Sequence, residues 1–209
     1  MGVKSFLYSV GYRYFRAPWD GGGPRAELVE LVESGRIKPC RAIDLGSGTA
    51  WNVIFMAQHG FEATGVDCAK GAIELGQSRA RAASVTATFV EDDLTNLKHV
   101  NGTFDLLVDY GTLDDLTIKD RDLYVKNVLA LTHPGSLFLF YCFEWPPRWW
   151  ERLLAVFGAF GAMEPGEAER RFDGYFDIGR IAGTSKPDFS KWPPGHATYL
   201  MTRNQEKTV

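Results

Sequence analysis

The sequence predicts an α/β fold in which a mostly parallel, doubly wound sheet carries helices on both faces. Short apolar runs alternate with helix-like segments along most of the chain, and this alternation is typical of a parallel sheet. The first apolar run leads directly into a Gly-x-Gly loop, Gly46–Gly48, which has the form of a loop that holds a nucleotide. Such sheets bind ligands beyond the carboxyl ends of their strands, so a site is expected there.

The elements follow one another in a regular order. Pro24 suits the first turn of a helix over 25–35, and Gly35 suits its C-terminal stop. Strands at 41–46, 62–67, 104–111 and 136–143 are each followed by a helix, at 50–60, 69–83, 120–132 and 146–160 respectively. A strand at 87–92 leads into a short connection, and strand-like runs at 175–183 and 197–203 close the chain.

Composition favours one domain with a substantial core. The chain has 209 residues, of which 45% are apolar and 13% aromatic, and its formal net charge is −3. This charge argues against a protein that binds nucleic acid through phosphate contacts. No apolar run is long enough to span a membrane, and the N-terminus lacks a signal-peptide pattern. Cys40, Cys68 and Cys142 have neither zinc nor disulfide spacing, so a cytoplasmic location is expected.

Carboxylates mark four successive strand ends. These acids are Asp44 at the first strand, Asp67 at the second, Glu91, Asp92 and Asp93 at the third, and Asp109 at the fourth. The glycine loop itself contains no Lys or Arg, so a pyrophosphate there would be repelled by Asp44 at close range. Asp67 lies 19 residues after Gly48, the spacing of an acid that accepts ribose hydroxyls. The ligand that fits is a positively charged nucleoside without phosphate, namely S-adenosylmethionine.

Four motifs now resemble the class I S-adenosylmethionine-dependent methyltransferases. "AIDLGSGTAWN", "GVDCAKGAI", "FVEDDLTNL" and "FDLLVDYGTLDDL" occur in the order and spacing of that family, and the resemblance covers roughly residues 25–145. It implies a Rossmann-like sheet with one reversed strand near its edge, formed by the final strand pair. The opening "YRYFRAPWDGGGPRAELVELVESGRIKP" is similar to the small-molecule branch with tellurite-resistance, thiopurine and thiol-type enzymes.

The resemblance implies a division of the chain and a set of roles. Residues 1–24 would form an N-terminal lid segment, 25–145 the cofactor-binding core, and 146–209 the acceptor-side helix and final strand pair, all within one domain, 1–209. The glycine loop would approach the methionine and ribose, Asp67 would bind the ribose hydroxyls, and Asp92 or Asp93 with Leu94 would meet the adenine. The full cofactor set is Trp19, Asp44, Gly46, Ser47, Gly48, Asn52, Asp67, Cys68, Asp92, Asp93, Leu94, Asp109 and Tyr110.

Two residues depart from the family pattern. Ala50 stands where many relatives have glycine, and bulky Trp51 occupies the third position of the dinucleotide glycine pattern. Either residue could narrow the loop, although Trp51 could equally pack on a helix face. Two rival functions therefore stay open: a methyltransferase fold that binds without turnover, and a nicotinamide-dependent oxidoreductase. The oxidoreductase is disfavoured by Asp44, by the missing glycine and by the lack of a Tyr-x-x-x-Lys pair.

Aromatic side chains dominate the segments expected around the methyl acceptor. The predicted acceptor-binding residues are Arg13, Trp19, Tyr110, Phe143, Trp145, Trp149 and Trp192. They indicate a flat, apolar or aromatic small molecule, with Trp19 as a lid residue, although several rings could simply build core. Trp149 shares a helical stripe with four apolar residues, whereas Trp150 points elsewhere and could close the pocket, form a homodimer contact or touch a membrane surface.

Few residues can act as a base at this site. His196, before the last strand, and Asp114, just past the fourth, are the candidates. Asp114 and Asp115 alone would make a poor octahedral site, so no metal is expected. We therefore expect a monomeric or homodimeric enzyme that transfers a methyl group from S-adenosylmethionine to O, S or N of a small molecule, leaning to an aromatic hydroxyl or thiol.

Overall fold

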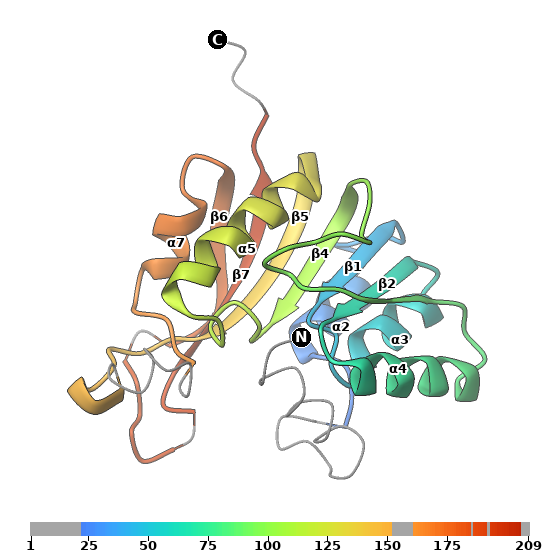
Figure 1. Cartoon of the computed structure of the whole chain (residues 1–209). Coiled ribbons are helices and arrows are strands. Elements are labelled where there is room, and N and C mark those ends of the chain that lie inside the picture. Colours follow the sequence, from blue (N-terminus) through green and yellow to red (C-terminus); the bar gives the residue numbers. More distant parts are fainter. Residues whose placement is uncertain (1–21, 152–160, 185, 192, 206–209) are drawn as a thin grey trace. The chain divides into compact units, whose positions relative to one another are not determined.

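A computed structural model of the chain describes residues 22–151, 161–184, 186–191 and 193–205 (Figure 1). The chain divides into two compact units, Met1–Leu106 and Leu107–Val209, and each unit is described by itself. Within the described residues, no helix combines the length and the apolar character needed to cross a bilayer.

Seven strands form the predicted sheet. They are β1 (Arg41–Leu45), β2 (Glu62–Asp67), β3 (Thr88–Glu91), β4 (Phe104–Tyr110), β5 (Thr132–Phe143), β6 (Phe176–Gly183) and β7 (His196–Arg203). Their order is β3-β2-β1-β4-β5-β7-β6. The β1–β2 and β2–β3 pairs are parallel, whereas β7 is antiparallel to both β5 and β6. The expectation of a mostly parallel sheet with one reversed strand near its edge is confirmed.

The helices follow the predicted alternation, with one addition. They are α2 (Ala26–Glu33), α3 (Trp51–Gln58), α4 (Lys70–Ala82), α5 (Ile118–Ala130) and α7 (Glu167–Phe172). The six-residue α7 was not expected from the sequence. Most of the helix predicted over 146–160 lies outside the described residues, although residues 149–151 are helical.

The first unit is closely packed because glycines allow its helices to approach. A Cβ added to Gly65 in β2 would lie 3.0 Å from a Val53 methyl group of α3. One added to Gly76 in α4 would lie 2.5 Å from the ring of Phe89 in β3. Real Cβ atoms do not approach so closely, so these two positions require glycine for the observed packing.

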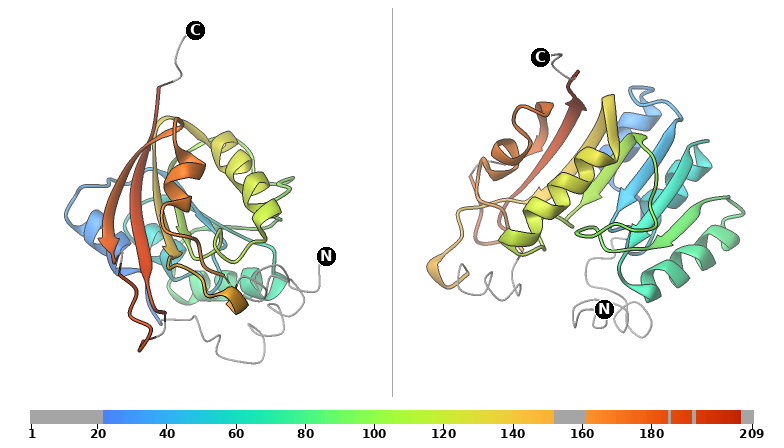
Figure 2. Two further views of the ribbon diagram at one scale, coloured as in Figure 1. Left: turned by 90° about the vertical axis from the view of Figure 1, so that its left-hand side faces the viewer. Right: turned by 45° about the horizontal axis from the view of Figure 1, so that its top comes forward.

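The second unit has an aromatic core on one face of its strands. Phe138 and Phe140 of β5 pack against Phe172 of α7 at ring-centroid distances of 5.5 and 5.9 Å. Helices α5 and α7 lie on the same side of β5, β6 and β7 (Figure 2). Buried Arg121 of α5 joins them through a two-pronged ion pair with Glu167, at 3.0 and 3.1 Å. This ion pair explains how so short a helix as α7 is held.

Candidate functional site

The glycine loop after β1 is bonded to the end of β2. The backbone N–H groups of Gly46 and Ser47 both donate to the carbonyl of Val66, at 2.8 and 2.9 Å. The N–H of Gly48 donates to Asp67 Oδ2 at 2.9 Å. Gly46 and Gly48 have φ angles of +77° and +47°, which favour glycine. The loop therefore has a defined conformation at the carboxyl edge of the first unit.

Asp67 connects this loop to the next helix. Its Oδ1 accepts from the N–H of Ala69 at 2.8 Å, just before α4 begins, while Oδ2 holds Gly48. Burial raises the pKa of Asp67, and the backbone donors act in the opposite direction. A carboxylate oxygen can accept more than one hydrogen bond, so Asp67 retains capacity for the hydroxyl groups of a ligand.

One polar atom of the loop stands out. Ser47 Oγ is buried and has no hydrogen-bond partner among the described residues. It lies against β2, where a Cβ added to Gly65 would come within 2.9 Å of it. Asp44, at the end of β1, is also buried. A buried hydroxyl without a partner is unfavourable, so its presence at a glycine loop indicates a place for a polar ligand group.

Ala50 and Trp51 both pack toward α4. Ala50 has φ +65° and is buried, and its methyl carbon would lie 3.1 Å from a Cβ added to Gly76. The Arg79 guanidinium stacks over the Trp51 ring at 4.3 Å and donates to the carbonyl of Thr49. The two departures from the family pattern therefore fill the interface between the loop and α4, in agreement with the packing interpretation of Trp51.

Other acids predicted to bind the cofactor hold the backbone instead. Asp92 Oδ2 accepts from three successive N–H groups, those of Lys98, His99 and Val100, at 2.9, 2.7 and 3.3 Å. Although burial opposes ionisation, these donors lower the pKa of Asp92. Asp92 therefore organises the loop after β3, and its contact with an adenine stays a prediction.

The neighbouring members of the predicted set are placed differently. Exposed Asp93 accepts from the N–H and hydroxyl of Thr95, and Leu94 is buried. Asn52 is buried and its Oδ1 accepts from the N–H of Arg25 at the start of α2. Cys68 is exposed. Asn52 thus fastens α2 to α3, which is a structural role that its position in the motif did not reveal.

In the second unit, Asp109 forms hydrogen bonds with the loop that follows it. It is fully buried and accepts from the N–H groups of Thr112 and Leu113, at 2.8 and 3.2 Å, and from the Tyr124 hydroxyl at 2.5 Å. Burial raises the pKa of Asp109 to about 6 despite these donors. Asp109 therefore shapes the loop that follows β4, and its place beside the cofactor stays a prediction.

An aromatic ladder runs along the other face of the strands. Tyr110 stacks on Tyr141 at 3.8 Å with the rings 8° from parallel, and His196 stacks on Tyr141 at 5.5 Å. Phe143 meets Tyr141 edge-on at 5.8 Å. Tyr110, Phe143 and His196 are half-buried. Sequence reasoning missed Tyr141, although it shares a face with Phe143 because strand residues alternate.

Asp114, in the loop after β4, is bonded to the backbone of Phe143. It is buried to 1% exposure, and its Oδ2 accepts from the N–H of Phe143 at 3.1 Å. Its Oδ1 has no hydrogen-bond partner among the described residues. Burial, and next the charge of Asp109, raise the pKa of Asp114 well above its ordinary value. Perturbed carboxyl groups of this kind cluster at functional sites.

The predicted tryptophans do not converge in the described part of the chain. Trp145 is fully buried and donates from Nε1 to buried Glu151 at 3.3 Å, so in the described structure it packs as a core residue. Trp149 is 75% exposed. Arg13, Trp19 and Trp192 lie outside the described residues.

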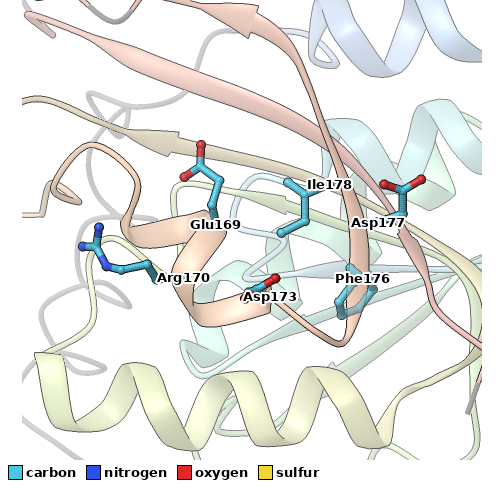
Figure 3. A pocket seen from close by; sticks show the side chains of 6 residues that line it. All are labelled: Glu169, Arg170, Asp173, Phe176, Asp177 and Ile178. Carbon is cyan, nitrogen blue, oxygen red and sulfur yellow. The ribbon is translucent and has the colours of Figure 1, made fainter. Parts of the chain in front are cut away.

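A separate hollow of about 450 Å³ lies between α7 and β6 (Figure 3). It is lined by Glu169, Arg170, Asp173, Phe176, Asp177 and Ile178. None of the predicted site residues lines it. Within the described ranges, no group of three or more His, Cys, Asp or Glu side chains is arranged to hold a metal ion.

Comparison with known proteins finds methyltransferases among the proteins that this chain resembles. Residues 42–135 match the profile of a family described as "Methyltransferase domain". The chain is 28% identical over 130 residues to a 2-heptyl-1-hydroxyquinolin-4(1H)-one methyltransferase of Mycobacteroides abscessus, covering 62% of this chain and 57% of that protein. It is also 28% identical over 121 residues to a probable thiol methyltransferase 2 of Arabidopsis thaliana, covering 57% and 53%. The chain thus spans little more than half the length of these relatives.

Solved structures share the fold. The 1,6-didemethyltoxoflavin-N1-methyltransferase of Burkholderia thailandensis, crystallised with 1,6-didemethyltoxoflavin and S-adenosylhomocysteine, superposes with a TM-score of 0.72. The match covers 97% of this chain and 88% of that chain at 15% identity, so it shows a shared fold and nothing more.

Proposed function

We propose that the chain is a class I methyltransferase that transfers a methyl group from S-adenosylmethionine to O, S or N of a small aromatic or apolar molecule. The observation that carries the cofactor assignment is the glycine loop held by Asp67, with the buried and unpartnered Ser47 hydroxyl inside it. Relatives named as small-molecule methyltransferases support the reaction class.

The residues of the first unit fit this cofactor chemically. When bound, S-adenosylmethionine supplies an electrophilic methyl group on a positively charged sulfur. Gly46–Gly48 would allow the cofactor to approach the backbone closely, Asp67 would accept from its ribose hydroxyls, and Ser47 Oγ would gain a polar partner. Asp44 and Asp67 make the loop acidic, which suits a cationic nucleoside and opposes a pyrophosphate. Arg79 does not offset this for a phosphate, because its guanidinium stacks on Trp51 and donates to Thr49.

Within the second unit, aromatic side chains suit a planar acceptor. The half-buried rings of Tyr110 and Phe143 present flat apolar surface of the kind on which aromatic molecules stack. His196 and Asp114 are the titratable side chains predicted as bases. The enzyme's task is to hold the acceptor atom in line with the transferred methyl group and to exclude water, since such positioning accounts for a large part of the rate.

Calorimetric titration with S-adenosylhomocysteine, with NAD⁺ in parallel, tests the cofactor assignment. We expect micromolar binding of S-adenosylhomocysteine and none of NAD⁺. Asp67→Ala should weaken binding at least 10-fold, because it removes the hydroxyl acceptor and releases Gly48. Asp177→Asn, at an exposed position in the hollow beside β6, is the matched control and should bind normally. Binding of NAD⁺, or none of either ligand to a folded protein, would contradict the proposal.

A further inference from the structure

Asp114 ends the hydrogen-bond ladder between β4 and β5. The N–H of Gly111 donates to the carbonyl of Tyr141 at 3.1 Å, as in an ordinary strand pair. Two residues further along β5, the N–H of Phe143 donates to the Asp114 carboxylate in place of a strand carbonyl. The Asp114 side chain therefore lies at the carboxyl edge of these strands, which is where sheets of this type bind ligands.

The backbone around Asp114 is firmly held. Buried Arg121 donates from Nη2 to the Asp114 carbonyl at 2.6 Å, and from Nε to the Leu116 carbonyl at 3.1 Å. Gly161 packs on the same turn, since a Cβ added there would lie 3.0 Å from the Asp114 carbonyl oxygen. A side chain fixed in this way is pre-organised to meet a ligand.

One oxygen of this fixed carboxyl group lacks a partner. Oδ2 is bonded to Phe143, whereas Oδ1 is buried and makes no hydrogen bond within the described residues. A buried polar atom without a partner is costly, by about 1–3 kcal/mol in mutational data. The geometry thus calls for a hydrogen-bonding group that the described part of the chain does not itself provide.

The charges around Asp114 indicate which kind of ligand group could bond to its Oδ1. Asp109 and Asp115 act on Asp114 from the end of β4 and from the same loop. Burial, and next the charges of nearby acids, raise the pKa of the Cys142 thiol in β5; these acids are Asp114, Glu144, Asp109 and Glu169. The nearby cation Arg121 is bonded to Glu167 and to backbone carbonyls. An anionic thiolate would be repelled here, whereas a neutral hydroxyl or amine would not.

We propose that Asp114 is the catalytic base and that the acceptor is a proton-bearing oxygen or nitrogen rather than a thiolate. This inference rests on the proposed methyltransferase function. As the acceptor lone pair forms its bond to the methyl carbon, the methyl–sulfur bond breaks, its electron pair stays on sulfur, and the acceptor proton moves to Asp114 Oδ1. A carboxylate that binds its proton more tightly than usual is the better base for such a transfer.

His196 is the rival base. Its ring stacks on Tyr141 at 5.5 Å, on the aromatic ladder, and the β5–β7 register pairs it with Phe143. It therefore belongs to the face that the planar acceptor is proposed to use. A His196→Gln variant separates the two assignments, because loss of the base and loss of a stacking surface affect kcat and KM differently.

Three acceptors that share one ring test the proposal: 4-nitrophenol, 4-nitroaniline and 4-nitrothiophenol. With S-adenosylmethionine, we expect methylation of the phenol or the aniline in preference to the thiol. Asp114→Asn should lower kcat by about 100-fold or more, the usual range for loss of a general base, and should abolish the rise of kcat with pH. Asp173→Asn, an exposed substitution in the same unit, is the matched control and should retain both.

A binding readout completes the test. Affinity for S-adenosylhomocysteine should be unchanged in Asp114→Asn, which shows that the variant is folded and that the cofactor assignment stands. Preference for the thiol, or an unchanged kcat and pH profile in Asp114→Asn, would overturn the inference; loss of S-adenosylhomocysteine binding by the wild type would instead remove the proposed function.

Discussion

At the scale of single residues, the same side-chain type serves three different purposes in this chain. Asp67 bonds two backbone N–H groups at the edge of a loop and can still accept from a ligand. Asp92 and Asp109 accept hydrogen bonds from successive N–H groups of the loops that follow them. Asp114 bonds one N–H and leaves one oxygen unpartnered in the described structure. The number and position of the backbone N–H groups that bond to each aspartate distinguish these three arrangements.

The Arg79–Trp51 pair gives a prediction at this scale. Arg79→Met keeps the length of the side chain but removes the hydrogen bond to Thr49 and the stacking on Trp51. Because these contacts fasten the glycine loop to α4, we expect the unfolding free energy to fall by about 1 kcal/mol and the Kd for S-adenosylhomocysteine to rise several-fold. Urea denaturation and calorimetry measure the two effects.

Arg81→Met is the control for that variant, since Arg81 is an exposed residue of the same helix. It should leave both quantities unchanged. If Arg79→Met lowered stability but left the Kd as it was, the pair would support the fold alone and have no part in positioning the loop.

At the scale of elements, close approach between α4 and the strand behind it depends on Gly76. In an exposed helix, Gly→Ala is stabilising by roughly 1 kcal/mol. At Gly76 the new methyl group would lie 2.5 Å from the Phe89 ring and 3.1 Å from Ala50. Overpacking costs about 1–3 kcal/mol, so the clash exceeds the gain in helix propensity. We therefore expect Gly76→Ala to be net destabilising in urea denaturation.

A second substitution shows whether the Phe89 ring is the cause. In the double variant Gly76→Ala with Phe89→Ala, the new methyl group no longer meets a ring. The cost of Gly76→Ala should therefore be smaller in the Phe89→Ala background than in the wild type. Equal costs in the two backgrounds would show that the helix does not depend on this contact.

At the scale of the whole molecule, the fold followed from the sequence more readily than the roles of the site residues. The alternation of apolar runs and helical segments is a local signal, so β1 to β5 and α2 to α5 were predicted near their observed bounds. The short α7 was not predicted because it is stabilised by ion pairs with α5, which is distant in the sequence. These pairs are Arg121–Glu167 and Arg171–Asp122. β5 begins at Thr132, earlier than the expected 136.

The site was predicted in part, for a related physical reason. Acids at strand ends are visible in the sequence, and the place of Asp67 beside the glycine loop agrees with its assigned position. Whether an acid faces a ligand or a loop depends on backbone donors several residues downstream, and no spacing pattern shows these. The burial of Trp145 and its bond to Glu151 were hidden in the same way.

The stability of the whole chain depends on pH through several acids with shifted pKa values. Some of them stabilise the fold at low pH and others at higher pH. Asp109 has a pKa raised from 3.8 to about 6 in the folded state by burial. Asp109 therefore adds to the free energy of unfolding most fully below pH 3.8, and this stabilisation is lost as the pH rises through 6. The shift corresponds to roughly 3 kcal/mol. Asp114, also raised, acts in the same direction.

Glu167 and Asp92 act in the opposite direction. Their pKa values are lowered in the folded state, where Arg121 and the backbone N–H groups respectively outweigh burial. Their contribution is present above the ordinary pKa values of 4.5 and 3.8 and is lost as the pH falls through the lowered ones. We therefore predict a maximum of thermal stability near pH 4–5, with a decline on either side, in melting curves recorded from pH 2 to pH 8.

The variant Asp109→Asn tests whether Asp109 causes the loss of thermal stability above the maximum. The amide is neutral at every pH, and its oxygen can still accept from the N–H groups of the loop. The fall in melting temperature between pH 4 and pH 7 should become shallower than in the wild type, while the fall below pH 4 stays the same. Asp173→Asn, an exposed substitution, should leave the whole profile unchanged. A variant that declined as steeply as the wild type would show that Asp109 ionises normally in the folded protein, and the buried pair with Asp114 would then not govern stability on this side of the maximum.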